Sequence, residues 1–303
     1  MKLKLRTLLP GLVALIALVG FALLLSRVAK PAPLPPLPNP NGYDDLVRAG
    51  EMLGGDLPDF MELRDMNEAE LRTALATTPF AKHDEALALA RLGLNRECRV
   101  PLDYSPTSAN HLGELSALKR VALAFIAEGR LAEMENRVGD AAESYLDVIR
   151  MAHESARGGV LLDAMHRRML EAVGLVSLEV LVPTINAQGC RKLGSELETI
   201  DARSESFETI LRQEKIWARR TYGFRGWISR LLTYRSLKQE EQKWAARMKG
   251  QQNQRRSLML KLAARAYKQE TGQRPKALTD LVPGYLKTAP PDGLLNTNIL
   301  LPP

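Results

Sequence analysis

Four histidines are the first residues to consider for chemistry, because an imidazole can exchange a proton or bind a metal near neutral pH. His83, His111, His153 and His166 occur in no HExxH or other metal-ligand spacing. His166 lies one helical turn after Asp163, which could orient its ring, although a surface helix gives the same spacing without any function. The sequence therefore predicts no catalytic residue and no metal site.

The motifs of the common enzyme classes are also absent. The chain contains no GxSxG, P-loop or GxGxxG sequence, so it gives no support to a hydrolase, a nucleoside triphosphatase or a dinucleotide-binding enzyme. We expect no cofactor. Cys98 and Cys190 are too few for a disulfide framework and have no CxxC spacing. They could pair in an oxidising compartment, or they could be two small buried thiols.

Charge is distributed very unevenly along the chain. Residues 41–211 hold 18 Lys and Arg against 29 Asp and Glu, a net charge of −11. Residues 212–276 hold 18 basic against 4 acidic residues, a net charge of +14. The overall net charge of +7 hides this contrast. Such a basic block predicts contact with a negatively charged partner or with the acidic half of the same chain.

Aromatic residues are interleaved with the basic ones in this segment, which contains all three tryptophans. At about 100° per residue, one broad helical face between residues 217 and 234 collects the rings, and several arginines lie off it. That is the layout of an interfacial amphipathic helix. The predicted interfacial aromatics are Trp217, Phe224, Trp227 and Tyr234. The predicted contacts to an anionic surface are Arg219, Arg220, Arg225 and Arg230.

Three interpretations of the basic segment remain open. It could pack its aromatic face into the core and its charges against the acidic helices of the first half. It could bind anionic lipid or another polyanion of the cell envelope. It could bind nucleic acid, although we expect the segment to lie outside the cytoplasm, where nucleic acid is an unlikely partner.

The N-terminus predicts a membrane anchor. Residues 8–25 are 18 residues without a charge, long enough to span roughly 27 Å as a helix. A cut after Ala29 would put Arg27 at the −3 position, so we expect an uncleaved signal anchor. Lys2, Lys4 and Arg6 precede the apolar run, which favours a cytoplasmic N-terminus and an exported domain. The predicted location is the inner membrane, with a single pass.

A proline-rich stretch follows the anchor. Residues 31–41 carry six prolines, which predicts a stiff polyproline II stalk of about 3.1 Å per residue. The predicted organisation is therefore a cytoplasmic tip and anchor at 1–30, a stalk at 31–41 and a folded domain at 42–303. Within that domain, residues 42–211 are acidic, 212–276 are basic, and 277–303 form a tail rich in proline and leucine.

The folded domain is predicted to be all-α. Asn67 and Glu70 have the spacing of a capping box, and residues 111–152 read as an antiparallel helical hairpin broken near Gly139 and Asp140. A further helix is expected from about residue 160 to Pro183, and another around residues 193–200. We expect an array of helical hairpins that ends in a long basic helical segment.

The tail from Arg255 onward carries a recognisable pattern: Ala264 and Tyr267 on a helix, then Gly272, Pro275, Leu278, Leu281, Pro283 and Tyr285. It resembles a segment of uncharacterised bacterial membrane-anchored α-helical proteins and, more distantly, the tails of type II secretion pseudopilins. The resemblance implies a fold and no activity. A pseudopilin carries a Glu five residues into its apolar helix, and the apolar run of this chain has no acidic residue. A pilus-assembly role is therefore not expected.

Together these features predict a membrane-anchored scaffold of the bacterial envelope that acts by interaction and contacts anionic surfaces through its basic segment. The expected partners are the membrane and an unidentified protein. The alternative is an envelope enzyme whose site is assembled from residues dispersed along the chain.

Overall fold

The computed structural model describes residues 13, 15–21, 36–54, 58–76, 82–102, 104, 109–232 and 234–289, with side chains except at 109–110, 224–232 and 234–237. These residues form an all-α fold without a strand. The elements are α2 (Gly42–Leu53), α3 (Phe60–Asp65), α4 (Glu68–Ala76), α5 (His83–Leu94), α6 (Ala109–Met134), α7 (Val138–Glu154), α8 (Leu161–Leu181), α9 (Ala187–Arg203), α10 (Phe207–Leu232), α11 (Tyr234–Thr271) and the 3-10 turn η2 (Leu278–Asp280).

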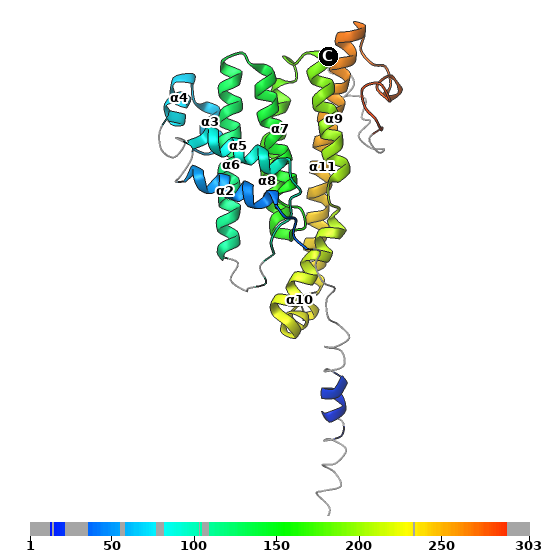
Figure 1. The fold of residues 1–303 in the computed structure, drawn as a ribbon. Helices are drawn as coiled ribbons and strands as arrows, with labels where there is room; N and C mark the ends of the chain where they lie inside the picture. The colour runs from blue at the N-terminus through cyan, green and yellow to red at the C-terminus, as the bar shows by residue number, and fades with distance from the viewer. Residues whose placement is uncertain are drawn as a thin grey trace, which may run out of the picture.

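Helices α6, α7, α8, α9 and α11 run along the long axis of the domain, and α2 and α5 cross α6 (Figure 1). The most extensive packing joins α9 with α11, α7 with α8, α6 with α7, and α2 with α5 and α6. Helix α10 lies at one end of the domain (Figure 1). The last helix, α11, therefore returns along the body and packs against α9 and α8.

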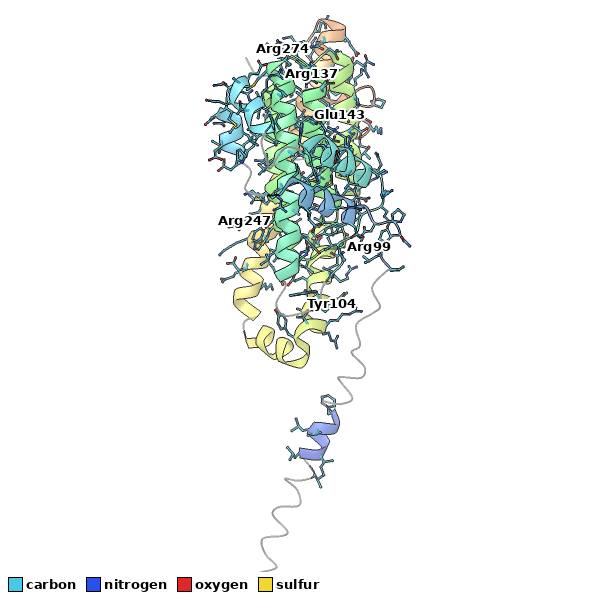
Figure 2. The ribbon with its side chains drawn as sticks, turned by 60° about the vertical axis from the view of Figure 1, so that its left-hand side comes forward. Arg99, Tyr104, Arg137, Glu143, Arg247 and Arg274 are labelled. Atoms are coloured by element: carbon cyan, nitrogen blue, oxygen red, sulfur yellow. The ribbon has the colours of Figure 1, made fainter. Side chains whose placement is uncertain are left out.

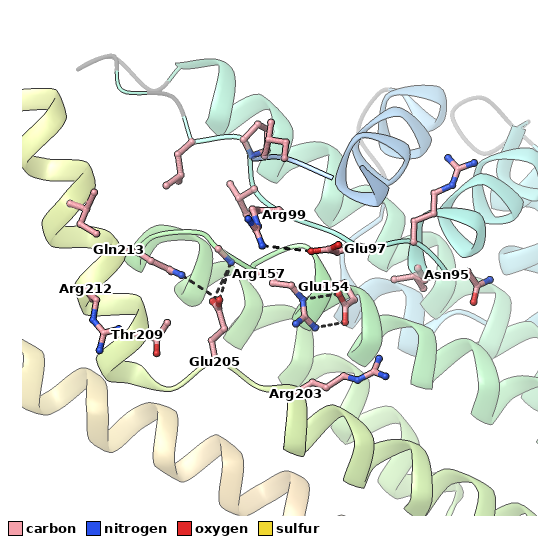
Figure 3. A pocket seen from close by; sticks show the side chains of 18 residues that line it. Asn95, Glu97, Arg99, Glu154, Arg157, Arg203, Glu205, Thr209, Arg212 and Gln213 are labelled. Atoms are coloured by element: carbon pink, nitrogen blue, oxygen red, sulfur yellow. Dashed lines mark hydrogen bonds and ion pairs between the residues drawn. The ribbon is translucent and has the colours of Figure 1, made fainter. Parts of the chain in front are cut away.

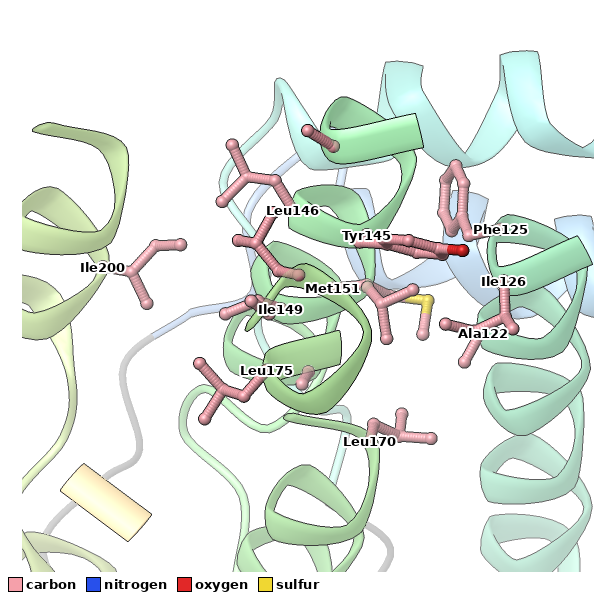
Figure 4. Close-up of a cluster of buried hydrophobic side chains, with 14 of the residues drawn as sticks. Ala122, Phe125, Ile126, Tyr145, Leu146, Ile149, Met151, Leu170, Leu175 and Ile200 are labelled. Atoms are coloured by element: carbon pink, nitrogen blue, oxygen red, sulfur yellow. The ribbon is translucent and has the colours of Figure 1, made fainter. Parts of the chain in front are cut away.

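The core lies between α6, α7 and α8, where Phe125, Tyr145 and Ile149 are almost completely buried (Figure 4). The predicted hairpin of α6 and α7 is confirmed. Its helices approach closely because residue 129 is a glycine: a Cβ there would lie 2.4 Å from Cε1 of Tyr145. The tyrosine hydroxyl leaves the core and donates to Glu133 at 2.5 Å. A ring of this size buries most of its area while its polar atom keeps a partner.

Helix boundaries follow local signals in most places. The capping box is confirmed: the Asn67 backbone amide donates to Glu70 at 2.8 Å, and the Glu70 amide donates to Asn67 at 3.0 Å. Helix α11 ends at Gly272, whose φ is 70°, as the sequence predicts. The predicted break at Gly139 and Asp140 is placed one turn too late. The chain turns at Asn136, with a φ of 59°, and α7 already begins at Val138.

The expected anchor and stalk fall largely outside the described residues. Of residues 8–25 the structure describes 13 and 15–21, which are helical with exposed apolar side chains. Across the described residues, no helix combines the length and apolar character that a bilayer crossing requires. Of the predicted stalk, residues 36–41 are described and 31–35 are not.

Candidate functional site

The predicted interfacial helix is divided by a kink. Gly223 has φ 54° and ψ −140°, which no helix contains, so α10 consists of two helical parts. The expectation of one continuous amphipathic face from residue 217 to 234 is therefore wrong, because a helical wheel is valid only along a single axis. The side chains of Phe224, Arg225, Trp227, Arg230 and Tyr234 lie outside the described residues.

The three predicted residues before the kink differ in solvent exposure: two are half-buried and one is exposed. Trp217 is half-buried, stacks edge-on against Tyr222 at 5.8 Å and lines a small cavity beside His111. Arg220 lies over the ring of Tyr104, 5.1 Å from its centroid. Arg219 is exposed. The structure thus turns the tryptophan toward the body and leaves Arg219 toward solvent.

Four basic residues of α11 contact the body of the domain. Arg255 and Arg256 both pair with Asp201 of α9, and Lys261 pairs with Glu179 of α8. Arg265 donates to the backbone oxygen of Ile185 at 2.9 Å. The internal-packing interpretation therefore accounts for the charge at residues 255–265 of α11, but not for the exposed charge on α10.

Arg255 is the centre of a buried polar network that we call the Arg255 hub. Its guanidinium is 3% exposed and contacts Glu171 of α8, which is 2% exposed. It also donates to Asp201 and to the Ser204 hydroxyl, the latter at 3.2 Å. Burial disfavours both charges, but the contact between them outweighs it: the pKa of Arg255 is raised, and the pKa of Glu171 is lowered to about 2.

His153 completes the hub, and its contacts are the part of the hub that most resembles a catalytic arrangement. Its Nδ1 lies 3.1 Å from the Ser204 hydroxyl, and its Nε2 lies 3.0 Å from both Glu171 and Arg255. Activation of the serine would need a proton on Nε2, so that Nδ1 could accept one from the hydroxyl. Burial, the largest effect, lowers the pKa of His153; Glu171 favours a proton on Nε2, and the guanidinium of Arg255 opposes it. The arrangement ties α7, α8, α9 and α11 together.

His111 has the opposite surroundings. Its ring bridges Asp163 of α8 at 2.8 Å and Glu114 at 3.0 Å, and Tyr43 donates to the same Glu114 oxygen at 2.9 Å. Burial alone would lower the pKa of His111, but the two carboxylates raise it to about 9. The ring is therefore a cation between two anions at neutral pH. Its spacing to Glu114 was visible in the sequence, whereas its contact with Asp163 joins residues 52 apart.

The spacing between Asp163 and His166 does not produce the pair that it suggests. Asp163 accepts from His111 and from the backbone amide of Val160, at 2.8 and 2.7 Å. The Nε2 of His166 is buried without a hydrogen-bond partner, and burial lowers the pKa of this histidine to about 4. The described residues contain no group of three His, Cys, Asp or Glu side chains arranged to hold a metal.

Both cysteines are free and buried, in agreement with the second interpretation of them. Burial raises the pKa of Cys98 to about 12 and that of Cys190 to about 11. A thiol with so high a pKa carries almost no thiolate at neutral pH and is a poor nucleophile. Neither cysteine is therefore a candidate catalytic residue.

A cleft of about 1170 Å³ opens between the linker after α5, the end of α7 and the α9–α10 junction (Figure 3). A second cavity of about 500 Å³ shares Glu154, Arg157, Arg203 and Glu205 with it. We call the two together the arginine cleft. It is lined by eight arginines: Arg91, Arg96, Arg99, Arg150, Arg157, Arg167, Arg203 and Arg212. Sequence reasoning did not find it, because these residues come from five separate segments with no shared motif.

Comparison with family models, with curated proteins and with solved structures finds no match to this chain.

Proposed function

We propose that this chain is a single-pass scaffold of the bacterial envelope, anchored with its N-terminus in the cytoplasm, whose exported domain stands on the bilayer with α10 toward the lipid. The observation that carries the proposal is where the stalk joins the domain. A stalk that enters beside α10 brings the basic residues of that helix close to the membrane surface.

The junction is fixed by hydrogen bonds to Arg99. Its guanidinium donates to the backbone oxygen of Pro36 at 3.2 Å. Its backbone amide donates to the Asn41 side chain at 2.9 Å, and Asn41 donates to its backbone oxygen at 2.9 Å. Leu37 lines the same cleft as Arg212 and Ile216 of α10. In Figures 1 and 2, α10 is at the end of the domain from which the helix of residues 15–21 extends.

The charge exposed on α10 supports the same orientation. Arg212, Lys215 and Arg219 are exposed, and among the described residues none of the three has an ion pair. A basic side chain near an anionic bilayer contributes about 1 kcal/mol, and the contribution fades as salt screens it. These residues therefore give an attraction that depends on both lipid charge and salt.

Topology is tested first, with protease added to spheroplasts. Since we expect an exported domain, external protease should digest residues 42–303 and leave a small anchor fragment. Complete protection of the chain, in cells where a periplasmic control protein is digested, would reverse the proposed orientation and leave nucleic acid as a possible partner.

The lipid contact is tested with the full chain reconstituted into vesicles and cut at a protease site introduced within residues 31–35. The released domain should sediment with anionic vesicles at low salt and leave them at high salt. Lys215→Ser with Arg219→Ser should weaken this binding by about 2 kcal/mol, roughly thirtyfold. Replacing Arg219, Arg220, Arg225 and Arg230 together by serine should weaken it further.

The matched control replaces two exposed lysines by serine, Lys268 and Lys276, which lie at and just after the C-terminal end of α11, the end of the domain opposite α10 (Figure 1). It removes the same charge and should leave binding almost unchanged. Binding that ignores lipid charge, salt and the α10 substitutions alike would overturn the proposed membrane contact.

A further inference from the structure

The arginine cleft has the size, charge and lining of a binding site. Its larger part, about 1170 Å³, lies slightly above the range of roughly 300 to 1,000 Å³ that is usual for small-molecule sites. We propose that the arginine cleft binds an anionic amphiphile, a molecule with a phosphate or carboxylate head and an apolar body.

The first argument is the pairing of the charges. Most charged groups of the cleft already have partners. Arg157 pairs with Glu154 at 2.7 Å, Arg96 pairs with Asp45 at 2.6 Å, and Arg150 pairs with Glu143, Asp147 and Glu196. Glu205 accepts from the backbone amide of Gly158 and from Gln213. The carboxylates of the cleft are therefore engaged.

The charged groups of the cleft that have no partner are positive. Within the described part of the chain, Arg203 and Arg212 make no hydrogen bond or ion pair through their side chains, and both line the larger cavity (Figure 3). A guanidinium presents its donors as a planar fork that matches the two oxygens of a phosphate or carboxylate. Two such forks at one opening select an anion over a neutral or cationic ligand.

Arg167 supplies an independent argument from the interior. It lines the smaller cavity together with Arg203, and its Nε is buried without a hydrogen-bond partner. Burial lowers the pKa of Arg167, and the nearby carboxylates of Glu171 and Glu205 do not offset this effect. A buried donor without a partner is costly, and an anion in the cavity would supply the missing acceptor.

The apolar residues of the cleft indicate that the ligand has an apolar body in addition to its anionic head. Leu37, Leu94, Val100, Leu102 and Ile216 line the larger cavity beside the arginines. A free inorganic anion would leave this surface in contact with water, whereas an attached hydrocarbon body would cover it. The shared chemistry fits two sources: an anionic lipid drawn from the membrane beside α10, or a soluble amphiphile.

The test uses the full chain in nanodiscs of zwitterionic lipid and titrates hexyl phosphate, hexanoate, inorganic phosphate and 1-hexanol by calorimetry. We expect hexyl phosphate or hexanoate to bind most tightly, inorganic phosphate to bind more weakly and 1-hexanol not to bind. Equal affinity for inorganic phosphate and hexyl phosphate would overturn the proposal that the ligand has an apolar body. Absence of binding by all four probes would overturn the proposal that the cleft is a binding site.

Substitutions locate the binding. Arg203→Gln and Arg167→Gln should each weaken binding of the better anionic probe at least tenfold, because each removes a charge-assisted hydrogen bond. Lys268→Gln is the matched control and should leave the affinity unchanged. Arg203 is exposed, so its substitution leaves the fold intact and keeps the test valid if Arg167→Gln fails to fold. Affinity that is unaffected by Arg203→Gln would overturn the assignment.

Two further comparisons are needed. One distinguishes a bilayer lipid from a soluble ligand, and the other distinguishes ligand binding from the membrane contact of α10. Nanodiscs that contain phosphatidic acid should compete with the soluble probe if the natural ligand is a bilayer lipid, and should not if it is soluble. The vesicle test of α10 uses Lys215 and Arg219, which do not line the cleft. Loss of membrane contact and loss of ligand binding are therefore measured by different residues.

Discussion

Arg255 on α11 is buried, and Arg167 on α8 is half-buried with a buried Nε; the two arginines differ in the groups that contact them. Arg255 contacts Glu171, Asp201 and Ser204, and its pKa is raised. Arg167 has a buried Nε without a partner, and its pKa is lowered. Burial acts against the charge of both, but only Arg255 has carboxylates in direct contact with its guanidinium.

The comparison separates structural charge from charge available for binding. In the Arg255 hub, every strongly buried charge has an opposite charge in contact, which fixes the positions of four helices. In the arginine cleft, the carboxylates are engaged and some guanidiniums are left over. A basic composition by itself does not indicate a binding surface; the unpaired fraction of the charge does.

The largest expected effect is on the hub. Arg255→Met leaves Glu171 buried without its main partner, and the free energy of unfolding should fall by about 3–5 kcal/mol in urea denaturation. The double variant Arg255→Met with Glu171→Met removes both charges and should recover most of this loss. A single-variant loss below about 1 kcal/mol would break the comparison, because the hub would then not be structural.

His111 and His153, each in contact with a carboxylate, should make the stability of the fold depend on pH in opposite directions. The pKa of His111 is raised from 6.5 to about 9, so its ion pairs stabilise the fold fully below pH 6.5 and lose this effect as pH rises through 9. We expect a loss of about 1–3 kcal/mol between pH 6.5 and 9.5, measured as the free energy of unfolding. His111→Gln should flatten this alkaline decline, and a decline that persists in the variant would contradict the assignment.

His153 should give the opposite dependence. Its pKa is lowered by burial, so the neutral ring stabilises the fold above pH 6.5, and that stabilisation is lost as pH falls below it. Unfolding free energy measured between pH 7 and 5 should decline in the native chain and decline less in His153→Gln. An equal decline in both chains would show that His153 is charged inside the hub.

The smallest effect is expected at Arg167. Because no hydrogen bond of its Nε is lost, Arg167→Met should change the free energy of unfolding by less than about 1 kcal/mol. Urea denaturation of Arg167→Met is compared directly with that of Arg255→Met. A loss comparable to that of Arg255→Met would remove the distinction between the hub and the arginine cleft.

Local signals in the sequence predicted much of the fold. Asn67 with Glu70 and the glycine at 272 gave correct helix ends, since caps depend on contacts within a few residues. The apolar spacing gave the hairpin of α6 and α7. The kink at Gly223 was missed because the same apolar spacing continues through it, and a periodic pattern does not report a change of axis.

The sequence by itself determined an all-α fold, the positions of most helices and the separation of acidic and basic segments, because these depend on composition and on neighbours along the chain. Only the tertiary structure decided which charges are neutralised. Arg255 meets Glu171 across 84 residues, and His111 meets Asp163 across 52. The energy of a charge in a protein depends on burial and on the nearest opposite charge, and both are set by how the helices pack.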